Sequence, residues 1–171
     1  MATNIDINKV ADLLILLCNE NGIAISPLKL QKLLYYTQAW HWVYFNGADI
    51  FTQQPEAWVN GPVYPCIYNR FKTIGKYDSI TTEAANIQYS LSDCINIIGL
   101  DQDQQNFIDA IFKHYGLMSH DRLVFLTHSE KPWSESREGL SPFEPSNNTI
   151  SKDTTISYYT ERLNRNRANV L

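Results

Sequence analysis

The sequence of 171 residues has only three cysteines, Cys18, Cys66 and Cys94. They have no short metal-site or redox spacing, so we interpret all three as reduced thiols and place Cys18 in a core. The longest apolar run, residues 13–18, is far too short to span a membrane. The N-terminus also lacks the basic, apolar and small-residue regions of a secretion signal. These absences predict a cytoplasmic protein without membrane contact.

Positive charge is scarce as well. Fourteen Lys and Arg stand against eighteen Asp and Glu, and the formal net charge is -4. A broad nucleic-acid interface needs clustered basic residues to neutralise phosphates, so nucleic acid is an unlikely partner. Hydrophobic residues make up 44% and aromatic residues 12% of the chain. This composition is typical of one globular domain, and the excess of aromatics indicates a thick core or an adhesive surface.

The sequence also lacks the patterns of common catalytic and cofactor sites. The seven glycines are scattered, and neither a phosphate-binding loop nor a Gly-x-Ser-x-Gly elbow occurs. We therefore expect no cofactor, no metal and no catalytic residue. The weakest alternative is an uncharacterised enzyme that uses Cys66 or a histidine together with Glu56, although we expect Glu56 to bond loop backbone. Four histidines are present, without metal-binding spacing: His41, His114, His120 and His128.

Two helices are predicted at the start of the chain. Residues 6–20 have apolar side chains at helical spacing, with Asp6 as N-cap. The second helix begins with Ser26 as N-cap and Pro27 at its first position, and it runs to about Phe45. It is apolar on nearly every side. A helix of that kind is buried all round or serves a second surface, so we expect it to be the central helix.

The middle of the chain has weaker patterns. Residues 47–65 are rich in turns, and a small strand pair is expected around 56–59. A short helix is predicted from Pro65 to about Lys72. Residues 79–82 favour a strand, and residues 86–91 favour a strand or the start of a helix.

The remaining helices are predicted from their caps. Asp101 is a plausible N-cap, and Gln104 three residues later completes a capping-box pattern. That helix should stop at Gly116, and Ser119 should cap the next one.

The C-terminal part is expected to be mainly loop at residues 128–148, followed by a last helix capped by Ser151. Residues 164–171 form a short basic tail that we expect to be flexible. The whole is predicted to be mainly α, a compact helical domain of residues 1–163 around a central hydrophobic helix, with a small antiparallel β element.

One stripe of the second helix has two interpretations. Lys29, Lys32, Tyr36 and Trp40 follow one another at helical spacing. The stripe would suit a partner protein, which it would grip by charge and aromatic contact. Equally, the lysine head groups would reach solvent from a largely buried helix.

Three separated segments resemble a known family. Residues 26–41 (SPLKLQKLLYYTQAWH), 56–65 (EAWVNGPVYP) and 126–133 (LTHSEKPW) occur in the order typical of the SocA-like, or Panacea-domain, antitoxins. Ile150-Ser151 before a helix fits the same pattern, and Thr37 stands where the family often has alanine. Relatives also include phage-associated GepA-like proteins.

The resemblance implies a non-enzymatic antitoxin in a toxin-antitoxin system. Members neutralise a toxin, encoded by an adjacent gene, by direct protein-protein binding. The alternatives, in falling order, are a proteolytic adaptor that delivers a toxin to an AAA+ protease, a DNA-binding autoregulator and the enzyme above. The expected partners are thus a cognate toxin and, in the adaptor case, a protease, while a homo-oligomer stays open.

The same segments supply the candidate site residues. Tryptophans in loops make good interface anchors, although loop packing on the central helix would also explain Trp58 and Trp133. Gly61 and Pro62 should fix a turn. The expected partner-binding residues are Lys29, Lys32, Tyr36, Trp58 and Trp133. The expected structural residues of the motifs are Gln38, Trp40, Glu56, Gly61, Pro62, Thr127, His128 and Pro132.

Overall fold

The structure is a computed structural model that describes residues 1–169, and it is mainly helical with one small antiparallel sheet, as predicted. None of the helices in this range has the length and hydrophobicity needed to cross a bilayer. The elements are α1 (Ile7–Glu20), α2 (Pro27–Tyr44), β1 (Glu56–Trp58), β2 (Gly61–Val63), α3 (Pro65–Phe71), α4 (Leu91–Ile98), α5 (Gln102–Ile111), η1 (Phe112–Gly116), α6 (His120–Ser129), α7 (Lys131–Ser136) and α8 (Lys152–Ala168).

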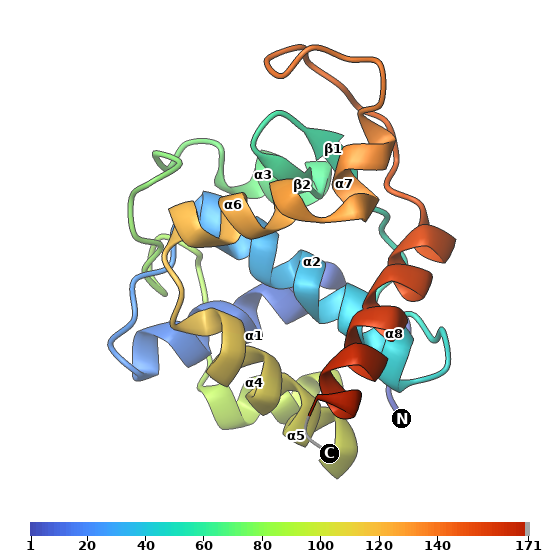
Figure 1. Cartoon of the computed structure of the whole chain (residues 1–171). Helices are drawn as coiled ribbons and strands as arrows, with labels where there is room; N and C mark the ends of the chain where they lie inside the picture. The colour runs from blue at the N-terminus through green and yellow to red at the C-terminus, as the bar shows by residue number, and fades with distance from the viewer. Residues whose placement is uncertain (170–171) are drawn as a thin grey trace.

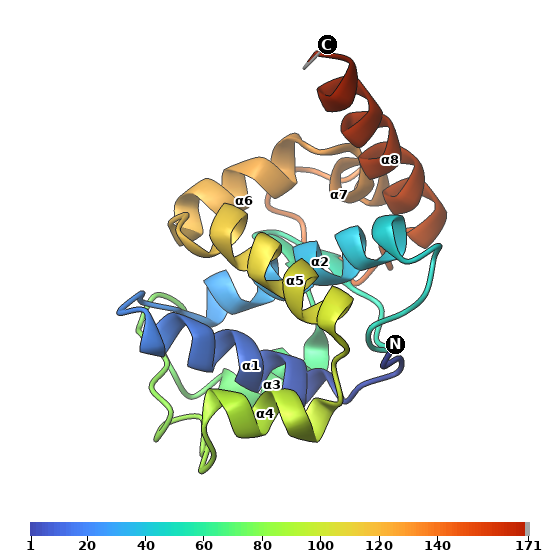
Figure 2. The ribbon, with the colours of Figure 1, turned by 90° about the horizontal axis from the view of Figure 1, so that it is seen from below.

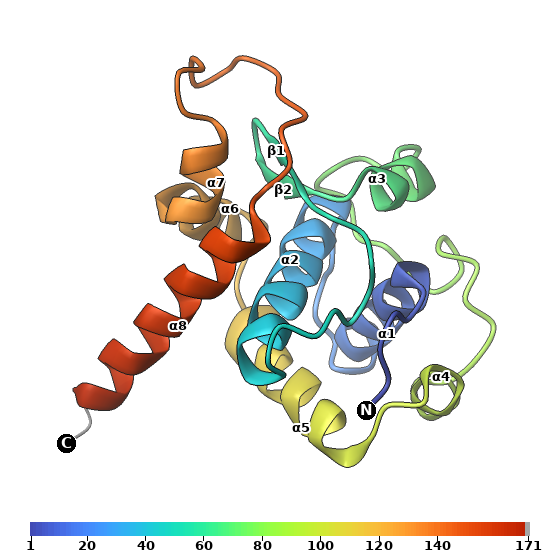
Figure 3. The same ribbon diagram turned by 90° about the vertical axis from the view of Figure 1, so that its right-hand side faces the viewer.

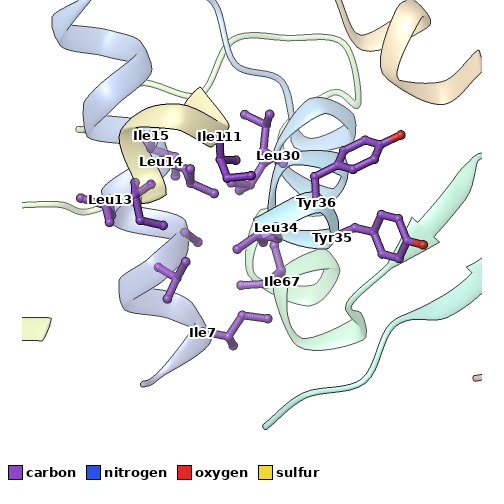
Figure 4. Packing of buried hydrophobic residues seen from close by; sticks show 14 of the residues in the cluster. Ile7, Leu13, Leu14, Ile15, Leu30, Leu34, Tyr35, Tyr36, Ile67 and Ile111 are labelled. Atoms are coloured by element: carbon purple, nitrogen blue, oxygen red, sulfur yellow. The ribbon is translucent and has the colours of Figure 1, made fainter. Parts of the chain in front are cut away.

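Helix α2 runs through the middle of the molecule, which confirms the predicted central helix (Figure 1). Helices α1, α3, α5, α6 and α8 and strand β2 all pack against it. Leu30 and Leu34 point toward α1, whereas Tyr35 and Tyr36 point away from that cluster (Figure 4). Because α2 is surrounded, apolar residues on every side of it are buried, and burial of this area is the main stabilising contribution to the fold.

The predicted N-caps are confirmed at five helices. In each, a side-chain oxygen accepts a hydrogen bond from a backbone N–H in the first turn of the helix. Each such cap stabilises its helix by about 1 kcal/mol, which is why these short polar residues mark the starts so well. The caps are Asp6, Ser26, Asp101, Ser119 and Ser151.

The predicted strand pair is a tight hairpin. Strands β1 and β2 pair antiparallel, and Gly61 opens β2 at a φ of 102° that favours glycine. The outer edge of β1 is covered by the chain before α8. Ala57 N donates to Asn148 O over 2.8 Å, and Ile150 N donates to Pro55 O over 2.9 Å. The hairpin thus sits between α2 and a late segment of the chain.

Two expectations in the middle of the chain are corrected. Residues 79–82 do not form a strand, since Ile80 N donates to Ile25 O and Ile80 O accepts from the Asn19 side chain, without a paired strand beside them. The segment 86–91 leads into α4, which was not predicted as a full helix. Ser90 and Asp93 close a reciprocal capping box at its start.

The expected loop at residues 128–148 is partly wrong. Helix α6 continues to Ser129, and α7 follows at once. Pro132 is compatible with α7 because it lies in the first turn, where its missing N–H breaks no helical bond.

Gln104 does not complete the predicted capping box. Its side chain instead binds the backbone of Ala2, accepting from Ala2 N over 2.8 Å and donating to Ala2 O over 2.6 Å. The helix begun after Asp101 reaches Gly116 as predicted, but its last turn widens into the π-helix η1.

Helix α8 continues without a break past the expected domain boundary at residue 163 to Ala168. Its C-terminal end leaves the body of the molecule in two perpendicular views (Figures 2 and 3). The part of the expected tail up to residue 168 is therefore helical, while residues 170 and 171 lie outside the described range.

Candidate functional site

The three motif segments meet around one buried lysine. Lys32 on α2 has no exposed surface, and its Nζ donates to Pro62 O over 3.0 Å. A methyl group at Gly61 would lie 2.6 Å from Lys32 Cε and 2.8 Å from Thr127 Oγ1. We call Lys32, Gly61, Pro62 and Thr127 the Lys32 cluster. The hairpin, α2 and α6 come together there because glycine lets their atoms approach closely.

The buried lysines refute the prediction that their head groups reach solvent. Lys32 and Lys29 are 0% and 5% exposed, and Lys29 Nζ donates to Gly116 O over 2.6 Å. Inside the protein, backbone carbonyl oxygens accept the hydrogen bonds that the two ammonium groups donate. Within residues 1–169 no carboxylate pairs with Lys32, and desolvation lowers its pKa to about 7. Burial therefore favours the uncharged form of this lysine far more than solvent does.

A side chain of α2 also covers the edge of β2. Gln31 accepts from Tyr64 N over 2.8 Å and donates to Tyr64 O over 3.2 Å. Together with the bond from Lys32 to Pro62, this fixes the hairpin against the start of α2. Gln38, further along the same helix, similarly binds the backbone of Ile50 and Phe51.

Trp133 attaches α7 to the hairpin. Its indole Nε1 donates to Trp58 O over 2.9 Å, and its ring stacks on His128 with centroids 4.0 Å apart. The guanidinium carbon of Arg137 lies 5.3 Å from the centroid of the Trp133 ring. The same guanidinium donates to Ala57 O over 2.9 Å. Desolvation and the charge of Lys32 lower the pKa of His128. Trp133 thus bonds the hairpin and packs against the hydrophobic core to which α2 belongs.

A second buried set attaches α8. Glu130 is 3% exposed and accepts from Tyr36 over 3.1 Å, from Tyr159, and from Arg162 over 2.9 Å. We call these four residues the Glu130 cluster. Desolvation raises the pKa of Glu130, and the three donors offset only part of that effect. The Tyr36 ring also stacks on Tyr115 at 4.0 Å, and Trp40 donates to the Tyr115 hydroxyl.

An open groove of about 720 Å³ lies beside the hairpin. Its walls come from the first turn of α2, the hairpin, α3 with the turn after it, and residues 145–147. Its surface is mainly apolar. The large side chains that line it are Leu28, Trp58, Val63, Ile67, Tyr68, Phe71 and Ile74.

The groove presents aromatic surface and positive charge. Tyr68 is 47% exposed and its ring packs 5.0 Å from that of Trp58. Trp58 Nε1 donates to Glu56 Oε2 over 2.6 Å, so Glu56 binds an indole and not loop backbone as expected. Lys72 and Lys76 also line the groove, and none of its described lining residues is acidic.

The predicted partner-binding residues fall into two groups. Trp58 and Trp133 are half-buried at the hairpin. Lys29, Lys32 and Tyr36 are buried and offer a partner little surface in this conformation. Among the predicted structural residues of the late motif, Thr127 and Pro132 are buried.

The sequence did not point to three exposed residues that line the groove, two of which give it positive charge. Tyr68, Lys72 and Lys76 lie outside the three recognised segments and carry no motif. Nor did the sequence point to Glu130 and Arg162. The place of Glu130 inside the recognised segment 126–133 was a signal that could have drawn attention to it.

The residues considered for metal binding and for nucleophilic attack can be placed in the structure. Within residues 1–169 no group of three or more His, Cys, Asp or Glu side chains is placed to bind a metal ion. Cys66 is exposed in the first turn of α3. Partial desolvation raises the pKa of its thiol, which opposes use as a nucleophile.

Comparison with known proteins agrees with the motif segments. Residues 30–134 match the model of the family described as "Antitoxin SocA-like, Panacea domain". The chain is also 33% identical over 141 residues to Antitoxin SocA of Caulobacter vibrioides, an alignment that covers 80% of this chain and 72% of that protein. No solved structure matches the chain. The matched range contains the whole hairpin and α3 to α6, and the chain belongs to the SocA-like antitoxin family with its Panacea domain.

Proposed function

We propose that this protein is an antitoxin that neutralises a cognate toxin, the product of an adjacent gene, by binding it directly. The observation that supports this most is the open apolar groove beside the hairpin. Binding sites are typically concave and mainly apolar with a few polar groups, and this groove has that form. A groove walled by Trp58 and the exposed Tyr68 has the aromatic character of an interface hot spot.

The composition of the groove favours binding over catalysis. Its described lining residues include no His, Cys, Asp or Glu. General acid-base and nucleophilic catalysis depend on such groups, often with shifted pKa values. This groove thus offers contact area and lacks His, Cys and carboxylate side chains, which supports a non-enzymatic binding role, and we place the protein in the cytoplasm.

Trp58 is the expected contact residue best placed for this role, because it forms part of the groove wall. Trp133 supports it from behind through the bond to the Trp58 carbonyl. Lys29, Lys32 and Tyr36 are buried beneath, so we propose that they act on the partner only through the shape of the hairpin and α2.

The test is growth rescue with complex formation. The adjacent open reading frame is expressed from an inducible promoter in cells that do or do not express this protein, and the pair is purified through a tag on one member. We expect growth arrest by the neighbour alone, and rescue with a stable stoichiometric complex. A harmless neighbour would refute the proposal.

The same experiment separates the proposal from the adaptor alternative. The amount of toxin is followed by immunoblot in cells with and without their AAA+ proteases. Binding alone predicts that toxin persists in an inactive complex in both strains. Rescue that depends on a protease and removes the toxin would replace direct neutralisation by delivery for degradation.

A further inference from the structure

We propose that the groove holds a short apolar segment of the toxin that carries acidic side chains where it passes Lys72 and Lys76. This inference rests on the proposed function and names the chemistry of the partner. It is supported by three features of the groove: its size, the aromatic pair in its wall, and its charge.

The size of the groove suits a peptide segment. Its volume of about 720 Å³ falls within the roughly 300–1,000 Å³ of sites that bury a small ligand. Such a space takes a few side chains and not a whole domain. The half-buried apolar residues Leu28, Val59 and Ile74 would remove those side chains from water.

The aromatic pair gives the segment an anchor point. Tyr68 and Trp58 pack at 5.0 Å, and Trp58 is fixed through Glu56 and through the bond from Trp133 to its carbonyl. A tryptophan fixed in this way loses little conformational freedom on binding. Hot spots are enriched in tryptophan and tyrosine for this reason, and the pair therefore marks where apolar side chains of the segment contact the groove.

The charge of the groove is opposite to that of the protein as a whole. The chain has a net charge of -4, yet the only charged residues among the described groove lining are Lys72 and Lys76. Both are exposed, and neither forms an ion pair within residues 1–169. Leu28 N donates to Lys76 O over 3.2 Å and so holds this loop at the start of α2. Two unpaired ammonium groups at a fixed rim complement carboxylates on a partner.

Other occupants fit less well. Nucleic acid would need many more basic groups than two, since each phosphate contact adds only a little affinity. A second copy of this chain carries the same net charge of -4, so the two molecules would repel each other as they approach. We therefore assign the groove to the toxin, and the experiment tests the other two occupants.

The test measures affinity for the purified product of the adjacent gene by biolayer interferometry. The groove variants are Tyr68→Ala and the double charge reversal Lys72→Glu/Lys76→Glu. The matched controls are Phe125→Ala, an aromatic residue of α6 that is 62% exposed, and Lys113→Glu/Arg122→Glu, which changes the net charge equally outside the groove. All altered side chains are exposed, and circular dichroism verifies that each variant is folded.

We expect each groove variant to weaken binding by about tenfold or more, and each control by less than about twofold. Wild-type affinity should fall as salt rises from about 50 to 300 mM, and the Lys72→Glu/Lys76→Glu variant should lose most of this dependence. Binding that survives both groove variants would overturn the inference while the complex itself upholds the proposed function. If Tyr68→Ala weakens binding and Lys72→Glu/Lys76→Glu does not, the inference that the bound segment carries acidic side chains would be overturned.

Two further measurements address the other occupants. If sedimentation shows that Tyr68→Ala converts a dimer of this chain to a monomer without affecting toxin binding, the groove belongs to a second copy. If a fluorescent DNA duplex binds the wild type with a steep salt dependence and the lysine variant does not bind, nucleic acid is the occupant. Either result would overturn the inference. If the wild type neither binds nor neutralises the neighbour, the proposed function itself fails.

Discussion

The groove and the Glu130 cluster differ in how fully their side chains are satisfied. In the cluster, one buried carboxylate accepts from two hydroxyls and a guanidinium. In the groove, Tyr68 is half exposed and two lysines have no described ion-pair partner. Buried polar groups that are fully bonded fix one conformation, whereas open apolar surface contributes little to folding and remains available to a partner. The comparison teaches that the side chains that stabilise this fold are separate from those of the proposed binding groove.

The largest expected effect comes from removing the acceptor at the centre of the Glu130 cluster. Glu130→Ala leaves Tyr36, Tyr159 and Arg162 without their partner in a buried site. We expect the free energy of unfolding, measured by urea titration, to fall by about 3–5 kcal/mol. The exposed Glu138→Ala should cost less than about 0.5 kcal/mol. Equal losses in the two variants would contradict the role given to the cluster.

Lys32 sharpens the comparison, because it is buried like Glu130 but has no described counter-charge. Its pKa is about 7 in the folded protein and 10.5 ordinarily. Between these values the unfolded chain binds the proton and the folded chain does not. This group therefore makes the folded state more stable as pH rises from 7, by up to about 1.4 kcal/mol per pH unit.

Lys32→Met should remove that dependence and leave the protein at least as stable as wild type near pH 7. Urea titrations at about pH 7, 8 and 9 test this, below the range where tyrosines of the unfolded chain ionise. The exposed Lys113→Met is the control and should keep the wild-type slope. A Lys32→Met variant with an unchanged slope would show that the ammonium stays charged.

The next effect concerns the contact that joins the hairpin to α2 and α6. Gly61→Ala adds a methyl group against Lys32 and Thr127 at a φ of 102°, so we expect a loss of about 2–3 kcal/mol. Gly139→Ala has a similar φ of 82° but open space around the added carbon. Gly139→Ala should lower the free energy of unfolding by only about 1 kcal/mol, which is the cost of the positive φ without any steric contact. The unfolding temperatures of the two variants separate steric contact at residue 61 from backbone strain. Equal decreases in the two unfolding temperatures would show that contact with Lys32 and Thr127 adds no cost.

The smallest effect compares two tyrosines directly. Tyr68→Ala removes a whole ring from the groove, while Tyr159→Phe removes one oxygen from the Glu130 cluster. We expect the ring deletion to change stability by less than about 0.5 kcal/mol. The oxygen deletion should cost about 1–2 kcal/mol, because it leaves a buried carboxylate short of a donor. The reverse order in urea titration would show that the groove stabilises the fold after all.

Local patterns predicted most of the fold. Helix starts at Ser26, Ser119 and Ser151 were recognised because a cap and the apolar periodicity after it lie within a few residues. Helix α4 was missed although Ser90 and Asp93 form such a box, since the helix is short and residues before it are polar. Helix α7 was missed because residues 128–148 were expected to be mainly loop, whereas Pro132 lies in the first turn, where proline is compatible with a helix.

The candidate site was harder to predict, because burial and pairing depend on parts of the chain that are distant in sequence. The three recognised segments do meet in space, but the sequence could not show that Lys32 is enclosed by Gly61 and Thr127. Nor could it show that Tyr68 and Lys72, outside every recognised segment, share a groove with Trp58. Pattern identified the residues that build the hairpin, and tertiary contact decided which of them face solvent.

The covered edges of the hairpin restrict how any other chain can be recognised there. Ala57 N and Pro55 O on one side are bonded to residues 148–150, and Pro62 O and Tyr64 on the other are bonded to α2. These backbone groups therefore cannot accept an added strand, which is a mode of recognition that tolerates many sequences. A partner that binds at the hairpin has to be recognised through side chains. Single substitutions in either protein can therefore change which partner binds, and related pairs can diverge until they no longer cross-react.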